Sequence, residues 1–229
     1  MSNFDKNLQN HSDYPVEYKE GKVQFFGKDF FVNESVLIPR LETEFLVREA
    51  RKILEKEEIK GIIDIGTGSG IIGLSLADFG IPAYLVDLSK EALKVAEKNT
   101  KNLFPENNHI SLIQSDLLKN VQLGNNNCTK NILFIANLPY IKNNDFANMS
   151  VDTRFEPDLA LFGGEKTGFE LYERLFAEIH AIGPQESIGI FEFGFDQKNT
   201  AQEILEQYDW KHEFFADHAG IERFVKVWF

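Results

Sequence analysis

Short apolar runs alternate with longer segments of helical periodicity from Gly61 onward. This alternation is typical of a mostly parallel β-sheet whose right-handed crossover helices cover both faces. The expected strands are residues 61–64, 83–87, 110–114, 131–136 and 187–193. The expected helices between them are residues 69–78, 90–102 and 168–182. Ser89 stands where it can cap the second helix, and Gly183 followed by Pro184 stands where the third must end.

The pattern changes at both ends of this alternating region. Residues 200–208 are expected to be helical, and residues 211–216 and 223–229 are expected to form two strands joined by the turn 217–220. Two consecutive strands with a short connection pair antiparallel. Before the alternating region, Gly27 and Lys28 are flanked by residues 23–26 and 29–32 as a candidate hairpin, and residues 42–56 have helical periodicity. The asparagine-rich residues 124–129 are interpreted as a solvated loop.

Composition limits the classes of protein that this chain can represent. Its 229 residues, 43% hydrophobic and 26% charged, predict an ordinary globular protein with a single core. The only cysteine is Cys128, so no intrachain disulfide or cysteine-cluster metal site is expected, and we expect no metal site. No apolar run approaches the ~18 residues of a membrane span, and residues 1–18 have no signal-peptide core. We therefore expect a cytoplasmic monomer that does not contact membranes.

The formal net charge of -12 gives the chain no electrostatic reason to bind nucleic acid. Such binding needs a surface rich in lysine and arginine, whose contacts release the counterions of the phosphates. We expect no direct nucleic-acid partner.

A glycine-rich loop lies where the first expected strand ends and a helix begins, and it contains Asp64, Gly66, Thr67, Gly68, Ser69 and Gly70. Glycines allow the backbone to approach a ligand, and the helix start offers free amide groups. Glycine spacing alone also matches the dinucleotide pattern of nicotinamide and flavin enzymes. Asp64 favours a different ligand, because a carboxylate attracts the sulfonium or amino group of S-adenosylmethionine and repels a pyrophosphate.

Two further strand ends supply candidate cofactor residues. Asp87 ends the second strand, where a carboxylate can bind two ribose hydroxyl groups. Asp116 and Leu117 follow the third strand, where the carboxylate can accept from an adenine amino group and the apolar side chain can cover the ring. Because the carboxyl ends of parallel strands share one edge, these residues are expected to lie beside the glycine loop.

The fourth expected strand is followed by Asn137, Leu138, Pro139 and Tyr140. An asparagine side chain and a backbone carbonyl can hold a planar amino group while a tyrosine ring stacks on it. This arrangement suits methylation of an NH2 whose lone pair is delocalised, since fixing this poor nucleophile near the methyl group supplies much of the catalysis. The sequence therefore predicts a methyltransferase that modifies an amide or an adenine amino group, with Asn137 reaching both cofactor and acceptor.

Several motifs, in this order along the chain, resemble those of the protein-glutamine methyltransferases that act on peptide-chain release factors. Residues 36–44 are similar to the family's Ile-Pro-Arg-Pro-Glu-Thr-Glu signature, and residues 137–140 are similar to its Asn-Pro-Pro-Tyr motif. The resemblance continues through residues 64–70, 155–157, 159–164, 192–197 and 217–223. It implies a Rossmann-like, seven-stranded class I methyltransferase sheet, mostly parallel, with an antiparallel C-terminal hairpin and a short β-hairpin before it.

The resemblance also implies the reaction. A methyl group would pass from S-adenosylmethionine to the glutamine side-chain amide of a release factor's Gly-Gly-Gln motif. Gly66 to Gly70, Asp87 and Leu117 would contact the cofactor, Asn137 and the Leu138 carbonyl would hold the amide, and Tyr140 would pack beside it. Arg40, Glu42 and Glu44 would tether the N-terminal hairpin to the catalytic loop rather than react. We expect residues 1–40 to form a short N-terminal segment and residues 41–229 to form the methyltransferase domain.

Two features depart from the family pattern. Leu138 stands in place of the first proline of Asn-Pro-Pro-Tyr, so Asn137 loses the restraint that a following proline imposes. Members of the family carry a helical N-terminal domain that helps to grip the release factor, whereas residues 1–22 precede the expected hairpin here.

Three alternative functions remain at this stage. The first is an adenine-amino methyltransferase for DNA or RNA, whose flipped base the same loop suits. The second is a non-catalytic binding protein with a methyltransferase fold, and the third is a dinucleotide-dependent oxidoreductase. The acidic charge argues against the first, the retained Asp64, Asp87, Asn137 and Tyr140 against the second, and the antiparallel C-terminal hairpin against the third.

Overall fold

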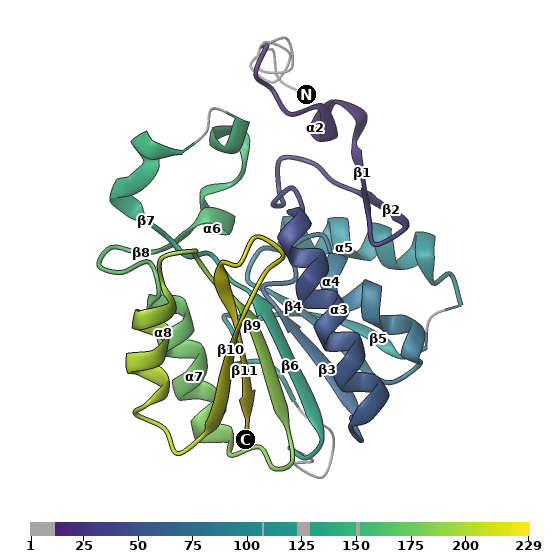
Figure 1. The fold of residues 1–229 in the computed structure, drawn as a ribbon. Helices are drawn as coiled ribbons and strands as arrows, with labels where there is room; N and C mark the ends of the chain where they lie inside the picture. Colours follow the sequence, from purple (N-terminus) through teal and green to yellow (C-terminus); the bar gives the residue numbers. More distant parts are fainter. Residues whose placement is uncertain (1–11, 107, 123–128, 150–151) are drawn as a thin grey trace.

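A single seven-stranded sheet forms the centre of the molecule (Figure 1). The computed structural model describes residues 12–106, 108–122, 129–149 and 152–229. The strand order is β10-β11-β9-β6-β3-β4-β5. Their bounds are Lys211–Ala216 for β10, Glu222–Trp228 for β11, Ile188–Glu192 for β9, Ile132–Asn137 for β6, Gly61–Ile65 for β3, Ala83–Asp87 for β4 and Ile110–Gln114 for β5. Neighbouring strands from β9 to β5 run parallel, and β11 is antiparallel to both β9 and β10. The predicted fold class is confirmed.

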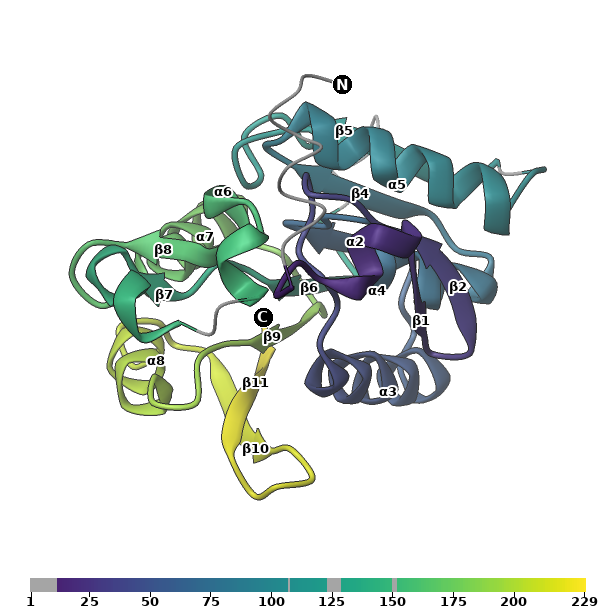
Figure 2. The same ribbon diagram turned by 90° about the horizontal axis from the view of Figure 1, so that it is seen from above.

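Helices cover both faces of this sheet, as Figure 2 shows from above. One face carries α3 (Leu41–Lys56), α4 (Ile71–Leu76) and α5 (Lys90–Leu103), and the other carries α7 (Glu170–Ile182) and α8 (Lys198–Leu205). Successive strand residues point to opposite faces, so Ile62 joins the core beneath α3 and α4 while Ile63 joins the core beneath α7 and α8. All of β3 is buried, which explains its continuous apolar run.

Two predicted helix ends are confirmed by their capping geometry. The Ser89 hydroxyl accepts from the backbone N–H of Ala92 at 3.2 Å, which satisfies one free donor at the start of α5. Gly183 ends α7 in the left-handed conformation, with φ of 62°, and its N–H donates to the carbonyls of Ile179 and His180.

The N-terminal hairpin forms, but its turn lies one residue earlier than the sequence predicts. Strands β1 (Lys22–Phe25) and β2 (Lys28–Phe31) flank Phe26 and Gly27, both with positive φ. The actual register buries Phe25 and Phe30 against α3. Since a shift of one residue moves every side chain to the other face, burial of these rings selects this turn. A short helix, α2 (Val16–Glu20), precedes the hairpin and was not predicted.

Other predicted boundaries differ by a few residues. The helix expected over residues 69–78 begins at Ile71, and its last turn, Ala77–Phe79, is a 3-10 helix. The helix expected over residues 200–208 is α8, which begins at Lys198 and ends at Leu205. Cys128 and residues 124–128 of the predicted loop lie outside the described residues.

A segment between β6 and α7 forms a separate layer above the carboxyl ends of the strands (Figure 1). It contains β7 (Ile141–Lys142), the 3-10 helices Asn143–Asn148 and Asp152–Phe155, α6 (Asp158–Leu161) and β8 (Phe162–Gly164). Strands β7 and β8 pair in parallel. None of these elements is predicted from the sequence, because elements of two to six residues have too little periodicity to detect.

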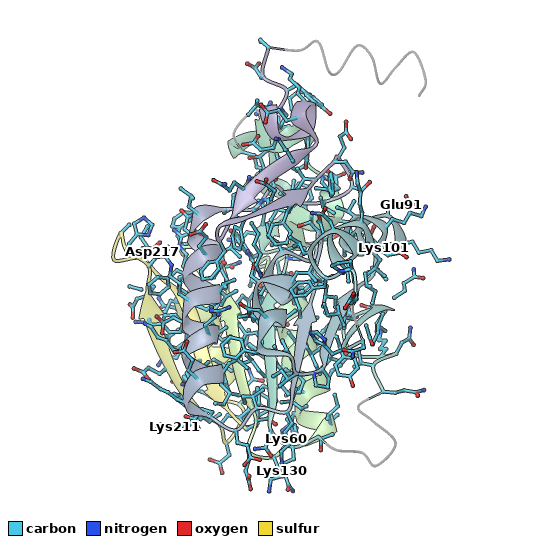
Figure 3. The ribbon with its side chains drawn as sticks, turned by 90° about the vertical axis from the view of Figure 1, so that its right-hand side faces the viewer. Lys60, Glu91, Lys101, Lys130, Lys211 and Asp217 are labelled. Atoms are coloured by element: carbon cyan, nitrogen blue, oxygen red, sulfur yellow. The ribbon has the colours of Figure 1, made fainter. Side chains whose placement is uncertain are left out.

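Charged side chains cover the outer surface and the amino ends of the strands. Lys60 and Lys130 precede β3 and β6 and lie at the end of the molecule opposite the N-terminal hairpin (Figure 3). Lys101 pairs with Glu97 at 2.5 Å on the exposed face of α5. Exposed pairs of this kind each contribute about 0–1 kcal/mol, so the buried apolar faces dominate the stability. No helix in the described part of the chain is long and apolar enough to span a membrane.

Candidate functional site

The glycine loop connects β3 to α4 through left-handed backbone. Gly66 and Gly68 have φ of 71° and 55°, a conformation that strains other residues. A Cβ at Gly66 would lie 2.8 Å from the Leu138 side chain. The two motifs singled out from the sequence therefore contact each other, and a glycine at position 66 allows this approach.

Asp64 holds the glycine loop through buried hydrogen bonds. Its side chain is fully buried, and Oδ2 accepts from the Thr67 hydroxyl at 2.6 Å and from the Gly73 N–H at 2.9 Å. Oδ1 has no hydrogen-bond partner among the described residues. Burial raises the pKa of this carboxyl group to about 6, although both hydrogen bonds oppose the shift. Asp64 lies behind the cavity rather than among its lining residues.

Asp87 lies at the carboxyl end of β4 and joins the glycine loop. Its Oδ2 accepts from the Gly68 N–H and its Oδ1 accepts from the Ser89 N–H, each at 2.8 Å. Burial raises the pKa of Asp87, and these backbone hydrogen bonds oppose the change. Because each carboxylate oxygen has two lone pairs, one acceptor site per oxygen remains for a pair of ribose hydroxyls.

Asp116 and Leu117 lie at the next strand end, beyond β5. Both Asp116 oxygens accept from Arg174 at 2.7 Å, and Lys119 donates to Oδ2 at 2.5 Å. Hydrogen bonds from Lys119 and Arg174 lower the pKa of Asp116. Leu117 is buried and has a φ of 52°, a left-handed backbone that is rare for leucine.

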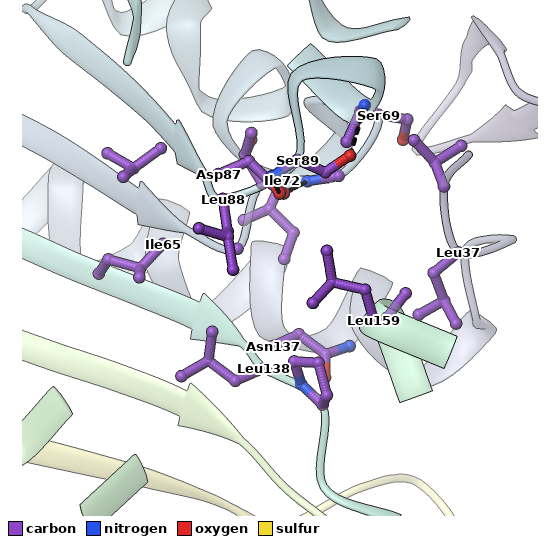
Figure 4. A pocket seen from close by; sticks show the side chains of 18 of the residues that line it. Leu37, Ile65, Ser69, Ile72, Asp87, Leu88, Ser89, Asn137, Leu138 and Leu159 are labelled. Atoms are coloured by element: carbon purple, nitrogen blue, oxygen red, sulfur yellow. Dashed lines mark hydrogen bonds between the residues drawn. The ribbon is translucent and has the colours of Figure 1, made fainter. Parts of the chain in front are cut away.

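A cavity at the carboxyl edge of the sheet brings most of the predicted cofactor residues together (Figure 4). Leu37, Leu88 and Leu159 supply apolar side chains to its lining. The predicted residues that line it are Gly66, Thr67, Gly68, Ser69, Asp87, Asp116, Leu117, Asn137, Leu138 and Pro139. Asp64 and Gly70 support it from behind, and Tyr140 lies outside it.

Residues 137–140, which we call the acceptor loop, begin at Asn137, the last residue of β6. The Asn137 Nδ2 donates to the Thr43 hydroxyl oxygen at 3.1 Å, which connects the loop to the first turn of α3. The backbone N–H of Leu138 donates to the Tyr172 hydroxyl of α7 at 2.9 Å. The Tyr172 hydroxyl also contacts the backbone oxygen of Glu192, at the end of β9. Three elements thus hold the first two residues of this loop.

The second half of the loop is held by glycines and by Gln197. The Gln197 Nε2 donates to the Tyr140 carbonyl at 2.9 Å. A Cβ at Gly163 would lie 2.3 Å from the Pro139 carbonyl oxygen, so only glycine fits between the loop and β8. Burial raises the pKa of Tyr140 to about 12, and the nearby Glu192 adds to the shift.

A second cavity lies on the other side of the same loop. It is lined by Leu37, Arg40, Asn137, Leu138, Pro139, Tyr140, Lys142, Met149, Gly194, Phe195 and Gln197, among others. Asn137, Leu138 and Pro139 line both cavities. The Asn-Leu-Pro segment, together with Leu37 and Ala160, therefore forms a wall shared by the two cavities.

Glu192 is a buried acidic side chain at the end of β9, next to this loop, with 1% of its surface exposed. Burial raises its pKa to about 7, while hydrogen bonding by Thr43, the charge of Arg223 and hydrogen bonding by Asn137 lower it. Its Oε2 has no hydrogen-bond partner among the described residues.

Four contributing residues were not assigned a role from the sequence: Thr43, Tyr172, Glu192 and Gln197. Thr43, Glu192 and Gln197 lie within the segments that carry the family resemblance, which was a usable signal. Tyr172 looks like any aromatic residue on the core face of a helix. Glu44 contacts the hairpin, since its Oε1 accepts from the Phe26 N–H at 2.9 Å, whereas Arg40 pairs with Glu156 at 2.7 Å. Neither side chain bonds to residues 137–140 in the described part of the chain, so the tether to the catalytic loop stays a prediction.

The fold and this edge of the sheet define the class of protein as a class I methyltransferase. The structure is similar to that of the ribosomal protein L11 methylase of Lactobacillus delbrueckii, with a TM-score of 0.58, 16% identity and coverage of 86% of this chain and 81% of that one. It is also similar to a human methyltransferase 10 domain containing protein, with a TM-score of 0.59, 16% identity and coverage of 100% and 98%.

Sequence comparison defines the family more narrowly. Residues 42–150 match the methyltransferase small domain. The chain is 36% identical over 200 residues to the release factor glutamine methyltransferase of Bacillus anthracis, covering 84% of this chain and 68% of that one. It is 32% identical over 216 residues to that of Clostridium acetobutylicum, covering 92% and 74%. The chain belongs to the release factor glutamine methyltransferase family. Membership of a methyltransferase family excludes the third alternative function, a dinucleotide-dependent oxidoreductase.

Proposed function

We propose that this protein transfers a methyl group from S-adenosylmethionine to the side-chain amide nitrogen of a glutamine in a peptide-chain release factor. The observation that carries the proposal is the shared wall of Asn137, Leu138 and Pro139 between the two cavities. One side offers the acidic and apolar groups that suit the cofactor, and the other offers a separate space for an acceptor.

The residues of the first cavity fit S-adenosylmethionine. Asp87 retains acceptor sites for ribose hydroxyls, and Leu117 is an apolar neighbour for adenine. The buried Asp64, with Oδ1 unsatisfied, is a negative charge that favours a cation nearby. Asp116, held by Arg174 and Lys119, keeps one lone pair on Oδ1 for an adenine amino group. The cofactor supplies an electrophilic methyl group on a positively charged sulfur.

The protein's contribution is to hold a weak nucleophile. The Asn137 side chain and the Leu138 carbonyl accept hydrogen bonds from the two N–H groups of the glutamine amide, and Tyr140 packs beside it. Methyl transfer forms a nitrogen–carbon bond, breaks the carbon–sulfur bond and releases one proton from nitrogen to solvent. Because the donors and acceptors are fixed before reaction, positioning and electrostatic stabilisation replace a strong base.

Family membership and charge support the choice of acceptor. The relatives from Bacillus anthracis and Clostridium acetobutylicum are release factor glutamine methyltransferases. The net charge of -12 disfavours a polyanionic substrate. The glutamine of a Gly-Gly-Gln loop presents a planar amide on flexible, narrow backbone, which can enter the second cavity.

The direct test is transfer of labelled methyl from S-adenosylmethionine to a purified release factor. The label is expected on the release factor, and it should disappear when the glutamine of the Gly-Gly-Gln motif is changed to alanine. Label found on DNA or RNA alone contradicts the proposed substrate. If calorimetry detects no binding of S-adenosylmethionine, the proposed methyltransferase activity is contradicted and the alternative of a non-catalytic binding protein is favoured.

A further inference from the structure

The orientation of the Asn137 side-chain amide decides whether this residue can accept a hydrogen bond from a substrate amide. The amide has a donor end, Nδ2, and an acceptor end, Oδ1, of nearly equal size. Only Oδ1 can accept from a substrate NH2 group. A rotation of the amide by about 180° would turn two donors toward the substrate's own donors, and this would remove the hydrogen bond that fixes the nucleophile.

The protein side of Asn137 presents acceptors. Nδ2 donates to the Thr43 hydroxyl oxygen at 3.1 Å. Glu192 is the register partner of Asn137 on the neighbouring strand β9, so the two side chains leave the sheet on the same side. Thr43 and Asn137 both favour the charged form of the neighbouring Glu192 carboxyl group, since both lower its pKa.

The chemistry of Glu192 makes this arrangement directional. Above its pKa of about 7, the Glu192 carboxylate accepts hydrogen bonds and donates none, so it favours an orientation with the Thr43 hydroxyl hydrogen and the Asn137 Nδ2 toward itself. The Thr43 oxygen is then left with lone pairs for Nδ2 rather than a hydrogen for Oδ1. Glu192 is 1% exposed, so water does not compete for these contacts.

We infer that Glu192 and Thr43 are positioning residues that hold the Asn137 amide with Nδ2 toward the protein and Oδ1 toward the acceptor nitrogen. This inference rests on the proposed function, because it assigns the polarity of the group that holds the glutamine amide. Neither residue takes part in the reaction itself. Glu192 does not line the second cavity, and Thr43 acts through its hydrogen bond with Asn137.

The test compares substitutions that keep shape with substitutions that remove the hydrogen bonds. Thr43→Val removes the hydroxyl at constant volume and is expected to lower kcat about tenfold to a hundredfold, with a smaller effect on KM for the release factor. Thr43→Ser keeps the hydroxyl and should restore kcat to within about threefold of the wild type. Glu192→Gln should lower kcat, because its amide can donate to Thr43 and reverse the polarity.

The double variant tests whether Thr43 and Glu192 act through the same amide or contribute independently to the structure. If Thr43 and Glu192 act through the same amide, Thr43→Val with Glu192→Gln should be about as impaired as the worse single variant. Unfolding midpoints and calorimetric Kd for S-adenosylmethionine are measured for every variant. Thr43 also lines the cofactor cavity, so a loss of cofactor affinity that matches the loss of kcat overturns the inference.

The remaining outcomes separate this inference from the proposed function. An active wild type whose Thr43→Val variant keeps kcat within about twofold, or a double variant whose losses multiply, overturns the positioning role alone. A wild type that binds S-adenosylmethionine but methylates no release factor overturns the proposed function, and the positioning role with it.

Discussion

The backbone N–H of Leu138 donates to the hydroxyl of Tyr172 at 2.9 Å, and a proline at position 138 could not make this hydrogen bond. Leu138 stands where the family motif has proline, so the chain lacks one backbone restraint and has one additional hydrogen bond. Both residues are buried. The acceptor loop is therefore attached to α7 through a contact that depends on the departure from the family motif.

Tyr172→Phe is expected to destabilise the wild type partly because it leaves the buried Leu138 N–H without an acceptor, an effect of about 1–3 kcal/mol. In a Leu138→Pro background no N–H exists, so the same substitution should have an effect smaller by about 1 kcal/mol. Urea unfolding of the four proteins measures this coupling. Equal losses in the two backgrounds would show that the hydrogen bond contributes nothing to stability.

Leu138→Pro by itself tests the loop's conformation. Proline restricts the preceding residue to extended backbone, the region expected at the end of a strand, so Asn137 should be held more firmly. We expect the methyl-transfer rate to stay the same or rise, measured under saturating release factor and S-adenosylmethionine. A fall of more than about tenfold with normal cofactor binding would mean that the Leu138 N–H, rather than the backbone restraint, supports catalysis.

The Asn137→Ala variant tests whether Asn137 acts mainly on the acceptor or mainly on the cofactor. It removes the group proposed to hold the acceptor, so methyl transfer should fall by at least about a hundredfold. The affinity for S-adenosylmethionine should change only a few-fold, because Asp87 and the glycine loop remain. Single-turnover kinetics and calorimetry measure the two effects. A comparable loss of both would place Asn137 mainly in the cofactor site.

Gly163→Ala tests the packing behind the acceptor loop. The new Cβ would lie 2.0 Å from the Gly168 carbonyl oxygen and 2.3 Å from that of Pro139, so the loop must move. We expect destabilisation of several kcal/mol, about 3 or more, and loss of most methyl transfer. Gly80→Ala is the matched control, since Gly80 has a φ of 72° but no atom within 4 Å of the new Cβ. It should lose only about 1 kcal/mol and keep its activity. Similar losses in both variants would rule out the proposed steric cause.

Asp64→Asn tests the electrostatic effect of the buried carboxyl group. The pKa of Asp64 is raised from 3.8 to about 6 on folding, so the folded state binds the proton more tightly between these values. Stability contributed by this group is therefore present at low pH and lost as the pH rises toward 6. Relative to the wild type, the Asp64→Asn variant should gain up to about 3 kcal/mol between pH 4 and 7. Unfolding free energies of the ligand-free proteins across this range measure the difference, and a constant difference would contradict it.

Local sequence was sufficient for the fold class and for the location of the two loops. The alternation of buried strands with helical segments is a local property, and it predicts β3, β4, β5, β6 and β9 to within one or two residues. Ser89 and Gly183 act within a single helical turn, so their roles were also readable. The hairpin turn was misplaced by one residue because burial of Phe25 and Phe30, a tertiary property, selects the register.

The partners of the acceptor loop were decided only by the tertiary structure. Thr43, Tyr172, Glu192 and Gln197 come from separate elements, and they meet Asn137 to Tyr140 only after β6 and β9 pair and the helices pack. Local periodicity does not predict which polar atoms will be buried beside one another. The sequence by itself therefore determined a methyltransferase fold with a glycine loop and an Asn-Leu-Pro-Tyr loop. Packing determined how the second loop is held, because hydrogen-bond partners distant along the chain are chosen by the three-dimensional arrangement.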